Sequence, residues 1–451
     1  MIVKKILFVN PSNKDDILEH VRILSLPPIN LGVLAGLTPE EYEMEIIDES
    51  IDTIDFDKDV DLVAITCMTP LAPRAYDISA RFRERGIPVV LGGIHASMEP
   101  QEAANFADAV VLGEAEEIWP TVLQDFEAGT LRKTYSCNRP SLKNVPWPRR
   151  DLFSPGYFIQ TVQTSRGCPF DCNFCSVTRF NGAHYRFRPF DEVIEEVSKL
   201  KGGRFFFIDD NIVGSGERCT KRTLKLFERL KDLGKEWGSQ ICISVVESPE
   251  LLRRAAESGA KWFFVGFESV EAETLSAMNK QINLRPTTRN FKDTIRKIQD
   301  RGIAVVGGFI FGSDTDTKDI FEKTVDFIHD TEIDAAQFTI LTPVPGTKLY
   351  EHLASEGRLL FRDYPKDWKR YNGFEVVFQP RNMTAEELQE GHISAYEATA
   401  SLKGSFARAI KTFFKTKSLF STISSFYWNY DCFKMISRSV GSLDESRFIK
   451  E

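Results

Sequence analysis

Short apolar runs alternate with segments of helical periodicity over most of the 451-residue chain. Brief runs rich in Ile, Val and Leu are typical of buried strands, whereas apolar residues repeated once per helical turn indicate helices that pack on one face. Glycines such as Gly86 and Gly129 mark the ends of two predicted helices. This alternation predicts an α/β protein with parallel sheets.

Residues 1–130 are predicted to form a first domain in which five strands alternate with four helices. The predicted strands are 5–10, 44–48, 62–66, 89–93 and 109–113, and the predicted helices are 30–37, 73–85, 100–106 and 118–127. We expect a doubly wound parallel sheet of the flavodoxin or Rossmann kind, which binds ligands at the carboxyl ends of its strands.

Residues 131–160 hold several prolines with little periodicity and are predicted to be a linker. Six further βα units follow in 161–370. The predicted strands are 161–165, 205–209, 240–245, 262–268, 304–311 and 336–341, and the helices are 190–200, 220–233, 249–258, 291–301, 320–330 and 348–355. Six units are too few for the usual closed barrel of eight.

The composition excludes some classes of protein but does not indicate a function. The chain is 42% hydrophobic and 27% charged, and its net charge of −8 gives no general electrostatic reason to bind nucleic acid. No secretory signal or membrane-spanning run is recognisable, and eight cysteines in so long a chain form no disulfide scaffold. A cytoplasmic location is therefore expected.

Three cysteines, Cys168, Cys172 and Cys175, follow the spacing C-x3-C-x2-C. Thiolates so closely spaced can hold an iron–sulfur cluster, and three ligands leave one iron of a four-iron cluster free to bind another molecule. The alternative is a zinc-stabilised interaction protein, with His184 as the nearest fourth ligand, although that spacing matches no common zinc motif.

This motif, with the aromatic Phe174 just before its last cysteine, resembles that of the radical SAM superfamily. The resemblance implies that the three cysteines hold a 4Fe-4S cluster whose open iron binds S-adenosylmethionine (SAM). Reduction of that cluster would then release a 5′-deoxyadenosyl radical. It also implies a partial (βα)6 TIM barrel for 161–370.

Polar residues and glycines at the carboxyl ends of the barrel strands are candidates for SAM contacts, because ligands of such barrels bind at this end. By the resemblance, acids after the second and fourth strands lie near SAM. The candidates are Asp209, Asp210, Gln240, Glu268, Ser269 and Gly312, and Phe174 of the cysteine motif is a further candidate for SAM contact. The alternative is that they cap helices and shape turns.

The first domain resembles the cobalamin-binding domain that precedes one large radical SAM subclass. A Gly-Gly-x-His stretch and a Gly-Glu pair follow its fourth and fifth strands. The D-x-H-x-x-G motif of other cobalamin proteins is absent, so the resemblance implies a corrinoid held without a protein imidazole. The candidate contacts are Thr69, Gly92, Gly93, His95, Gly113 and Glu114. Alternatively, His95 bonds a neighbouring carbonyl and Glu114 is a turn acid.

Residues 371–451 are predicted to be a helical C-terminal domain. Its 402–438 segment has seven Lys or Arg against one acid, and Phe406, Ile410, Phe413 and Phe414 share one helical face. Either this face packs on the barrel or the first domain, or it forms a peripheral contact with anionic lipid.

The whole pattern predicts a cobalamin-dependent radical SAM methyltransferase acting on an unactivated carbon. The alternative enzyme keeps the radical but performs a cyclisation, oxygenation or carbon–carbon coupling. The predicted partners are a small-molecule, lipid or peptide substrate and an electron donor such as flavodoxin or ferredoxin, with no nucleic acid.

Overall fold

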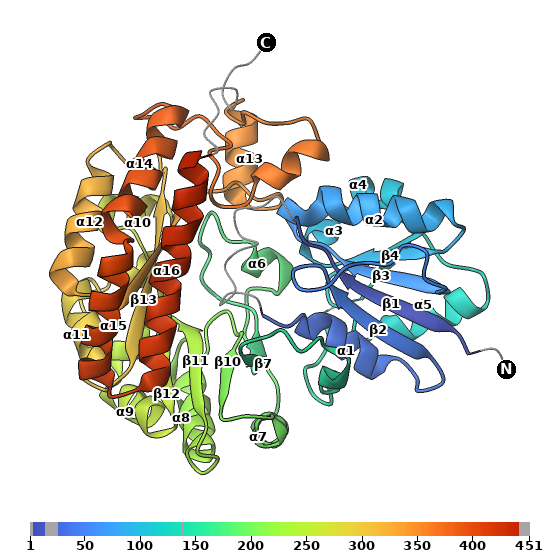
Figure 1. Ribbon diagram of the computed structural model, residues 1–451, viewed down its shortest axis with the longest axis horizontal. Coiled ribbons are helices and arrows are strands. Elements are labelled where there is room, and N and C mark those ends of the chain that lie inside the picture. Colours follow the sequence, from blue (N-terminus) through green and yellow to red (C-terminus); the bar gives the residue numbers. More distant parts are fainter. Residues whose placement is uncertain (1–2, 14–25, 138, 442–451) are drawn as a thin grey trace.

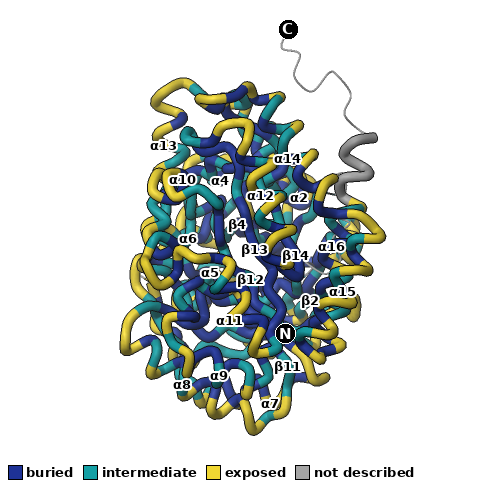
Figure 2. The backbone as a smooth tube through the Cα atoms, turned by 90° about the vertical axis from the view of Figure 1, so that its left-hand side faces the viewer, coloured by how far each residue is buried: buried dark blue, intermediate teal, exposed yellow. Residues whose placement is uncertain are grey.

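The computed structural model describes residues 3–13, 26–137 and 139–441, and it contains two α/β units side by side (Figure 1). Each unit has its own six-stranded parallel sheet, and the last helices lie against the second unit. Figure 2 shows that the strands are mostly buried and that the exposed segments are loops and outer helices. The α/β prediction with two parallel sheets is confirmed.

The first sheet has the strand order β2-β1-β3-β4-β5-β6. Its strands are β1 (Lys5–Asn10), β2 (Glu43–Asp48), β3 (Leu62–Thr66), β4 (Val89–Gly92), β5 (Ala109–Leu112) and β6 (Thr134–Ser136). The last strand lies in the predicted linker, so that prediction was wrong for this part. Only Tyr135 of β6 is buried, and a three-residue strand leaves no apolar run to recognise.

Helices cover both faces of this sheet. Those on one face are α1 (Ile29–Leu37) and α5 (Trp119–Glu127), and those on the other are α2 (Ala72–Glu84), α3 (Ile94–Met98) and α4 (Pro100–Phe106). Along β1, Ile6 and Phe8 enter one core, whereas Leu7 and Val9 enter the other. This alternation buries the strand on both sides and confirms the doubly wound arrangement.

The second sheet is an open, parallel array in the order β14-β13-β12-β11-β10-β7. Its strands are β7 (Gln160–Val162), β10 (Arg204–Phe207), β11 (Glu236–Ile241), β12 (Ala260–Glu268), β13 (Ala304–Phe311) and β14 (Ala335–Ile340). Helices α7 (Phe190–Lys199), α8 (Glu217–Lys231), α9 (Pro249–Glu257), α10 (Ala272–Ala277), α11 (Phe291–Gln299), α12 (Ile320–Thr331) and α13 (Lys348–Ser355) accompany them. The predicted six-unit partial barrel is confirmed.

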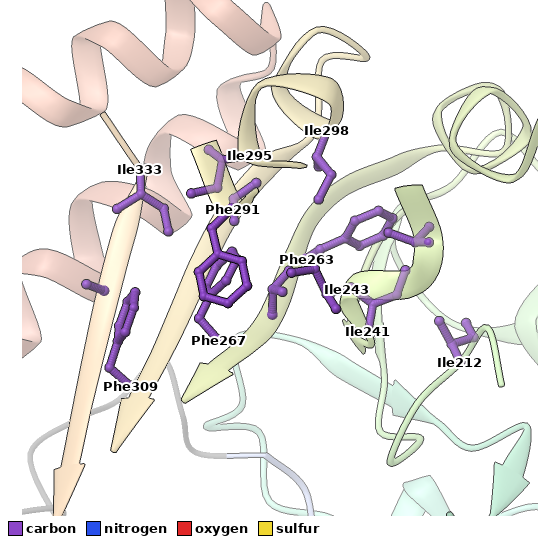
Figure 3. Close-up of a cluster of buried hydrophobic side chains, with 14 of the residues drawn as sticks. Ile212, Ile241, Ile243, Phe263, Phe267, Phe291, Ile295, Ile298, Phe309 and Ile333 are labelled. Atoms are coloured by element: carbon purple, nitrogen blue, oxygen red, sulfur yellow. The ribbon is translucent and has the colours of Figure 1, made fainter. Parts of the chain in front are cut away.

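The outer face of this sheet carries the largest core of the protein. Figure 3 shows Phe263, Phe267 and Phe309 projecting from the strands towards Phe291 and Ile295 of α11. The inner face also carries aromatic rings, and there Trp262 and Phe264 pack against Trp428 near the C-terminus.

The third barrel strand begins and ends earlier than predicted. The strand is β11, and most of the apolar run 241–246 forms the 3-10 helix Ile243–Glu247. The residue Gly238 at the centre of β11 has no side chain because a Cβ there would lie 2.4 Å from the ring of Trp262 on β12. Because glycine is needed at this position, β11 contains few apolar residues, and its sequence does not resemble a buried strand.

Residues 371–434 do not form a domain with its own core. Helix α14 (Ala385–Thr399) packs on β14, where the Tyr396 hydroxyl donates to the Phe338 carbonyl at 2.8 Å. Trp368, just before the predicted boundary at 371, and Tyr371 and Val377, after it begins, belong to a core of the first unit. The C-terminal segment therefore joins both units rather than following them as a separate domain.

Helices α15 (Leu402–Thr416) and α16 (Leu419–Gly441) complete the described chain. Helix α16 lies on the inner face of the sheet, with Trp428 packed against Val306. Helix α15 packs through small and hydroxyl side chains, namely Ser405, Ala409, Thr412 and Thr416. The C-terminal helices therefore pack on the barrel, as the first alternative states, but α15 does so without its Phe-rich face, which is exposed.

Candidate active site

The three predicted cluster ligands lie in the loop that follows β7, at the carboxyl end of the barrel. Two short antiparallel strands, β8 (Ser165–Arg166) and β9 (Arg186–Phe187), join the two ends of this loop. Gly167 has a φ of +92°, and a Cβ there would come within 2.4 Å of the His184 carbonyl oxygen. Only glycine fits this crossing, which brings the Cys168 amide to the Gly182 carbonyl at 3.1 Å.

The separation of the three thiols argues against a single zinc ion. Among the described residues, the potential ligands that all lie within 4.8 Å of one another are Asp314, His352 and Glu356, so the three thiols spread further apart. Zinc with bonds of about 2.3 Å would draw its sulfurs to roughly 3.8 Å from one another. The proposed fourth ligand, His184, is exposed. At least one pair of the three thiols is therefore more than 4.8 Å apart, which a single zinc ion does not favour.

The thiols also lie in a site that disfavours bare negative charge. Burial raises the pKa of the Cys168 thiol to about 11 and that of the Cys172 thiol to about 12. Burial also raises the pKa of Cys175. Thiolates in this environment require a bound cation, and iron supplies it, so the donor set fits an iron–sulfur cluster.

The two acids after β10 have different roles. Asp209 is 0% exposed, and its carboxylate accepts hydrogen bonds from the Thr164 amide and hydroxyl and from the Ser165 hydroxyl. No surface is left for SAM, so the prediction of a direct contact does not fit Asp209, which instead anchors the start of the cysteine loop. Asp210 accepts from the Gly167 amide at 3.2 Å and keeps some exposure.

Glu268 ends β12 in an unusual conformation. Its φ is +64°, in the left-handed region that non-glycine residues rarely adopt, and the sheet register shifts there. Its carboxylate contacts the Lys280 ammonium at 2.6 Å. Such a locally strained residue is typical of ligand sites. Sequence analysis missed Lys280, because nothing in its local pattern marks it.

Lys280 lies close enough to the cysteine loop to influence its charges. Burial opposes its charge, yet Glu268, Cys172 and Cys242 raise its pKa above the ordinary lysine value. Its positive charge in turn lowers the pKa of Cys172, against the larger effect of burial. The SAM contact predicted for Glu268 therefore involves an ion pair rather than a lone acid.

The remaining predicted SAM residues are not all alike. Ser269 is buried and its hydroxyl accepts from the Glu271 amide, which makes it a turn residue. Gly312 has a φ of +104°, and a Cβ there would press on Leu388, so packing requires glycine. Phe174 packs against the outer core, and Gln240 lines the inner face of the barrel. Direct SAM contact by these residues stays a prediction.

A cavity of about 340 Å³ lies between the two units. Its floor is formed by the carboxyl ends of the first sheet, and its far wall by the barrel residues Gln163, Arg166, Phe180 and Asn181. It lies at the carboxyl ends of β3, β4 and β5, the edge at which doubly wound sheets bind ligands. The last two wall residues lie only a few positions after Cys175, so the cavity borders the cysteine loop.

Four predicted cobalamin residues line this cavity: Gly92, Gly93, Gly113 and Glu114. At Gly113 a Cβ would meet nothing within 4 Å, so the cavity extends to the backbone there. At Gly93 a Cβ would lie 2.8 Å from the Cys67 amide, which explains this glycine by packing. No histidine occurs among the described lining residues, in agreement with a corrinoid held without imidazole.

His95 and Thr69 do not reach the cavity, so the prediction of corrinoid contact is wrong for both. His95 is 0% exposed; its Nδ1 lies 3.3 Å from the Thr69 hydroxyl and its Nε2 3.1 Å from the Glu102 carboxylate. Trp368 donates to the same carboxylate. The histidine therefore ties α3 to the C-terminal segment, through a carboxylate rather than the neighbouring carbonyl considered above.

Glu114 has a stronger role than a turn acid. It is buried and pairs with Arg166 at 2.7 Å and with Arg186, which flank the cysteine loop. Arg166 also pairs with Glu116 at 2.6 Å. This network, which we call the bridging ion pairs, links the cavity of the first unit to the base of the cysteine loop.

Comparison with known proteins identifies both units. A family model described as the radical SAM superfamily matches residues 162–328, and one described as a B12 binding domain matches residues 21–123. Bacteriochlorophyllide d C-12(1)-methyltransferase from Chlorobaculum tepidum is 30% identical over 422 residues, 89% of each chain. The chain belongs to the cobalamin-binding radical SAM family.

Other members of this radical SAM family agree. Bacteriochlorophyllide d C-8(2)-methyltransferase from Chlorobaculum tepidum is 31% identical over 370 residues, covering 77% of this chain and 80% of the relative. The structure of TsrM, a radical S-adenosylmethionine methyltransferase from Kitasatospora setae with cobalamin and a [4Fe-4S] cluster bound, superposes with a TM-score of 0.70 at 15% identity. That match covers 98% of this chain and all of TsrM and shows the shared fold.

The family membership assigns a 4Fe-4S cluster, SAM and cobalamin to this enzyme. The three cysteines fit the cluster, and the cavity with its open backbone at Gly113 fits a corrinoid. In the described part of the chain, no helix has both the length and the apolar character needed to cross a bilayer.

Filling the cavity is expected to reduce cobalamin binding. A Gly92→Leu variant adds a side chain at a lining position with ordinary backbone angles, where a Cβ has room. Its longer side chain occupies corrinoid space, so cobalt per protein after anaerobic reconstitution should fall at least about tenfold. Gly203→Leu, at an exposed glycine, is the matched control. Equal cobalt content in the two variants would remove the cavity as the corrinoid site.

Proposed function

We propose that this enzyme methylates an unactivated carbon of an apolar small molecule. When bound, the cluster with SAM supplies a radical that removes hydrogen from carbon, and a methylated corrinoid supplies the methyl group. The names of the two Chlorobaculum relatives state carbon positions, which supports carbon as the methyl acceptor. The residues of this chain hold the cofactors and exclude water.

One observation supports the proposal above the others. The cavity of the first unit and the cysteine loop share a wall, because the bridging ion pairs join Glu114 to Arg166 two residues before Cys168. A corrinoid site beside the cluster suits the transfer of a methyl group to a radical formed on the substrate. We therefore place the substrate carbon between the two sites.

SAM labelled in its methyl group tests the function directly. The anaerobically reconstituted enzyme, reduced by flavodoxin or ferredoxin as the proposed electron donor, is expected to release 5′-deoxyadenosine and to transfer the label to a product carbon. The measurement is mass spectrometry of products from candidate apolar substrates. Formation of 5′-deoxyadenosine with an unlabelled, modified product would favour a cyclisation, oxygenation or coupling instead.

We also propose that α15 contacts an anionic lipid surface. Its Phe406, Ile410, Phe413 and Phe414 side chains are 42–65% exposed. Exposed Lys403, Lys411 and Lys417 lie on the same helix and its end. Clustered apolar and basic side chains on one helix are typical of interfacial binding.

Vesicle flotation tests this contact. A Phe406→Glu/Phe414→Glu variant should float with phosphatidylglycerol vesicles at least about tenfold less than the unmodified chain, since each buried Phe contributes roughly 1.5–3 kcal/mol. Val3→Glu, an exposed apolar position of the first unit, is the control. If the unmodified chain does not float at low salt, this contact is ruled out.

A further inference from the structure

A second cavity lies inside the barrel, away from the cofactor cavity. It has a volume of about 260 Å³ and lies between the inner face of the sheet and α16. Strands β10, β12 and β13 contribute Phe206, Trp262, Phe264 and Val306, and the helix contributes Phe420, Ser424 and Trp428. We call this space the lumen pocket.

Aromatic rings form most of its walls. Phe206 and Trp262 stack with ring centroids 4.8 Å apart and planes 7° apart, and Trp428 meets Phe264 at 5.9 Å. Two glycines make room for these rings: a Cβ at Gly238 would lie 2.4 Å from the Trp262 ring. At Gly308 a Cβ would lie 2.9 Å from the Phe264 ring. Glycines at these two strand positions therefore allow the Trp262 and Phe264 rings to lie flat against the inner face of the sheet.

The pocket also holds polar groups that have no partner. The Trp262 Nε1 atom is buried and makes no hydrogen bond. The side-chain amides of Gln240 and Gln337, which also line the pocket, form no hydrogen bond with any other described residue. Buried polar groups are normally satisfied, so the Trp262 indole N–H points to a ligand that carries an acceptor oxygen. The Gln240 and Gln337 amides are exposed and half-buried, and they can bond the same oxygen because they line the same pocket.

Charge is missing from the same walls. None of the described lining residues is Asp, Glu, Lys, Arg or His. An ionised ligand group would lose its hydration here without compensation, which is costly. The lining thus accepts an uncharged body and rejects a carboxylate or an ammonium.

Strand β12 runs from the lumen pocket to the end of the barrel that carries the cysteine loop. Trp262, Phe264 and Gly266 alternate onto the inner face of β12, and Glu268 ends the strand beside the cysteine loop. At about 3.3 Å per residue, Phe264 lies roughly 13 Å from Glu268. A substrate of that length reaches from the pocket to the cluster end.

We propose that the lumen pocket binds the apolar, uncharged body of the substrate, with one oxygen of that body bonded by Trp262 and the two glutamines. This inference rests on the proposed function and specifies its substrate class. The substrate is an elongated or flat hydrocarbon-rich molecule with a hydroxyl or carbonyl oxygen. Helix α16, by closing the pocket with Phe420 and Trp428, sets the length of the body that fits.

Retinol and retinoate test the pocket without any turnover. Both have the same hydrocarbon body, but retinol ends in a hydroxyl and retinoate in a charged carboxylate. With the cofactor-loaded full chain, energy transfer from tryptophan to retinol should saturate, and retinoate should bind at least about tenfold more weakly. Retinoate binding as tightly as retinol would overturn the proposal.

Two matched variants locate the binding. Ser424→Phe fills the pocket from α16 and should weaken retinol binding on the order of ten- to a hundredfold, whereas Thr422→Phe, on the same helix but outside the lining, should not. Cluster absorbance and the unfolding midpoint confirm that both variants fold. Equal retinol affinity in the two variants, or loss of binding in the Phe406→Glu/Phe414→Glu variant instead, would contradict the assignment. Failure of methyl transfer alone would not, because this readout needs none.

Discussion

A Cys172→Ala variant is expected to lose the iron–sulfur cluster and, with it, all SAM cleavage. Its thiol is one of the three cysteines of the loop that are predicted to hold the cluster. Cleavage should fall by more than about a thousandfold, because the uncatalysed reaction is negligible by comparison. Iron and sulfide per protein, visible absorption and 5′-deoxyadenosine formation measure the loss.

A buried cysteine outside the loop provides the comparison. Cys219 lies on α8 with only 7% exposure and contacts Gly214 rather than the cysteine loop. Cys219→Ala should retain the full cluster content and SAM cleavage. The cluster assignment fails if Cys172→Ala retains iron and sulfide at the level of Cys219→Ala, or if the unmodified protein contains zinc without sulfide.

Replacing Arg166 by methionine is expected to destabilise the protein by about 3–5 kcal/mol. Its guanidinium is 13% exposed and neutralises Glu114 and Glu116, which are 3% and 12% exposed. Arg186 still pairs with Glu114 in the variant, but Glu116 loses its described partner. A buried carboxylate without a cation is costly, so the urea unfolding midpoint should fall.

A double mutant separates this charge effect from lost packing. Adding Glu116→Gln to Arg166→Met removes the orphaned charge and should restore at least about 1 kcal/mol. Arg149→Met, which breaks an ion pair to Asp151 with partners 38% and 61% exposed, should cost no more than about 1 kcal/mol. If Arg166→Met is as mild as Arg149→Met, the bridging ion pairs do not hold the two units together.

The role of the cysteine loop was predictable because its three candidate ligands lie close together in the sequence. Three thiols within eight positions stay together in any fold, so their joint role needs no tertiary information. The glycines of the first unit were predictable for a related reason, since strand ends of a parallel sheet share one edge.

The contacts of His95 and Glu114 could not be predicted from their positions in the sequence. His95 follows the glycines that line the cavity, yet the turn of α3 carries its ring to Thr69 and Glu102. Glu114 looks like an ordinary turn acid, yet arginines more than fifty positions away pair with it. Loop residues show their partners only after the two units have docked.

Helix α15 shows the same limit for hydrophobic patterning. The apolar pattern left open whether this helix packs on the protein or meets a lipid surface. The buried face is the one with Thr412, whose hydroxyl donates to the Asp334 carboxylate at 2.6 Å. Burial raises the pKa of Asp334, and hydrogen bonds from Thr412 and Gln299 oppose that rise. The buried Asp334 carboxylate requires hydrogen-bond donors, and the hydroxyl-bearing face of α15 supplies one of them.

The order of amino acids alone predicts two parallel α/β units, three cysteines as cluster ligands and one edge of the first sheet as the corrinoid site. These features depend on periodicity and on short spacings, which are local properties. Tertiary structure alone reveals the bridging ion pairs, Lys280 beside Glu268, and the lumen pocket under α16. Each of these joins residues distant in the chain, and their charges or rings meet only when packing closes the space between them.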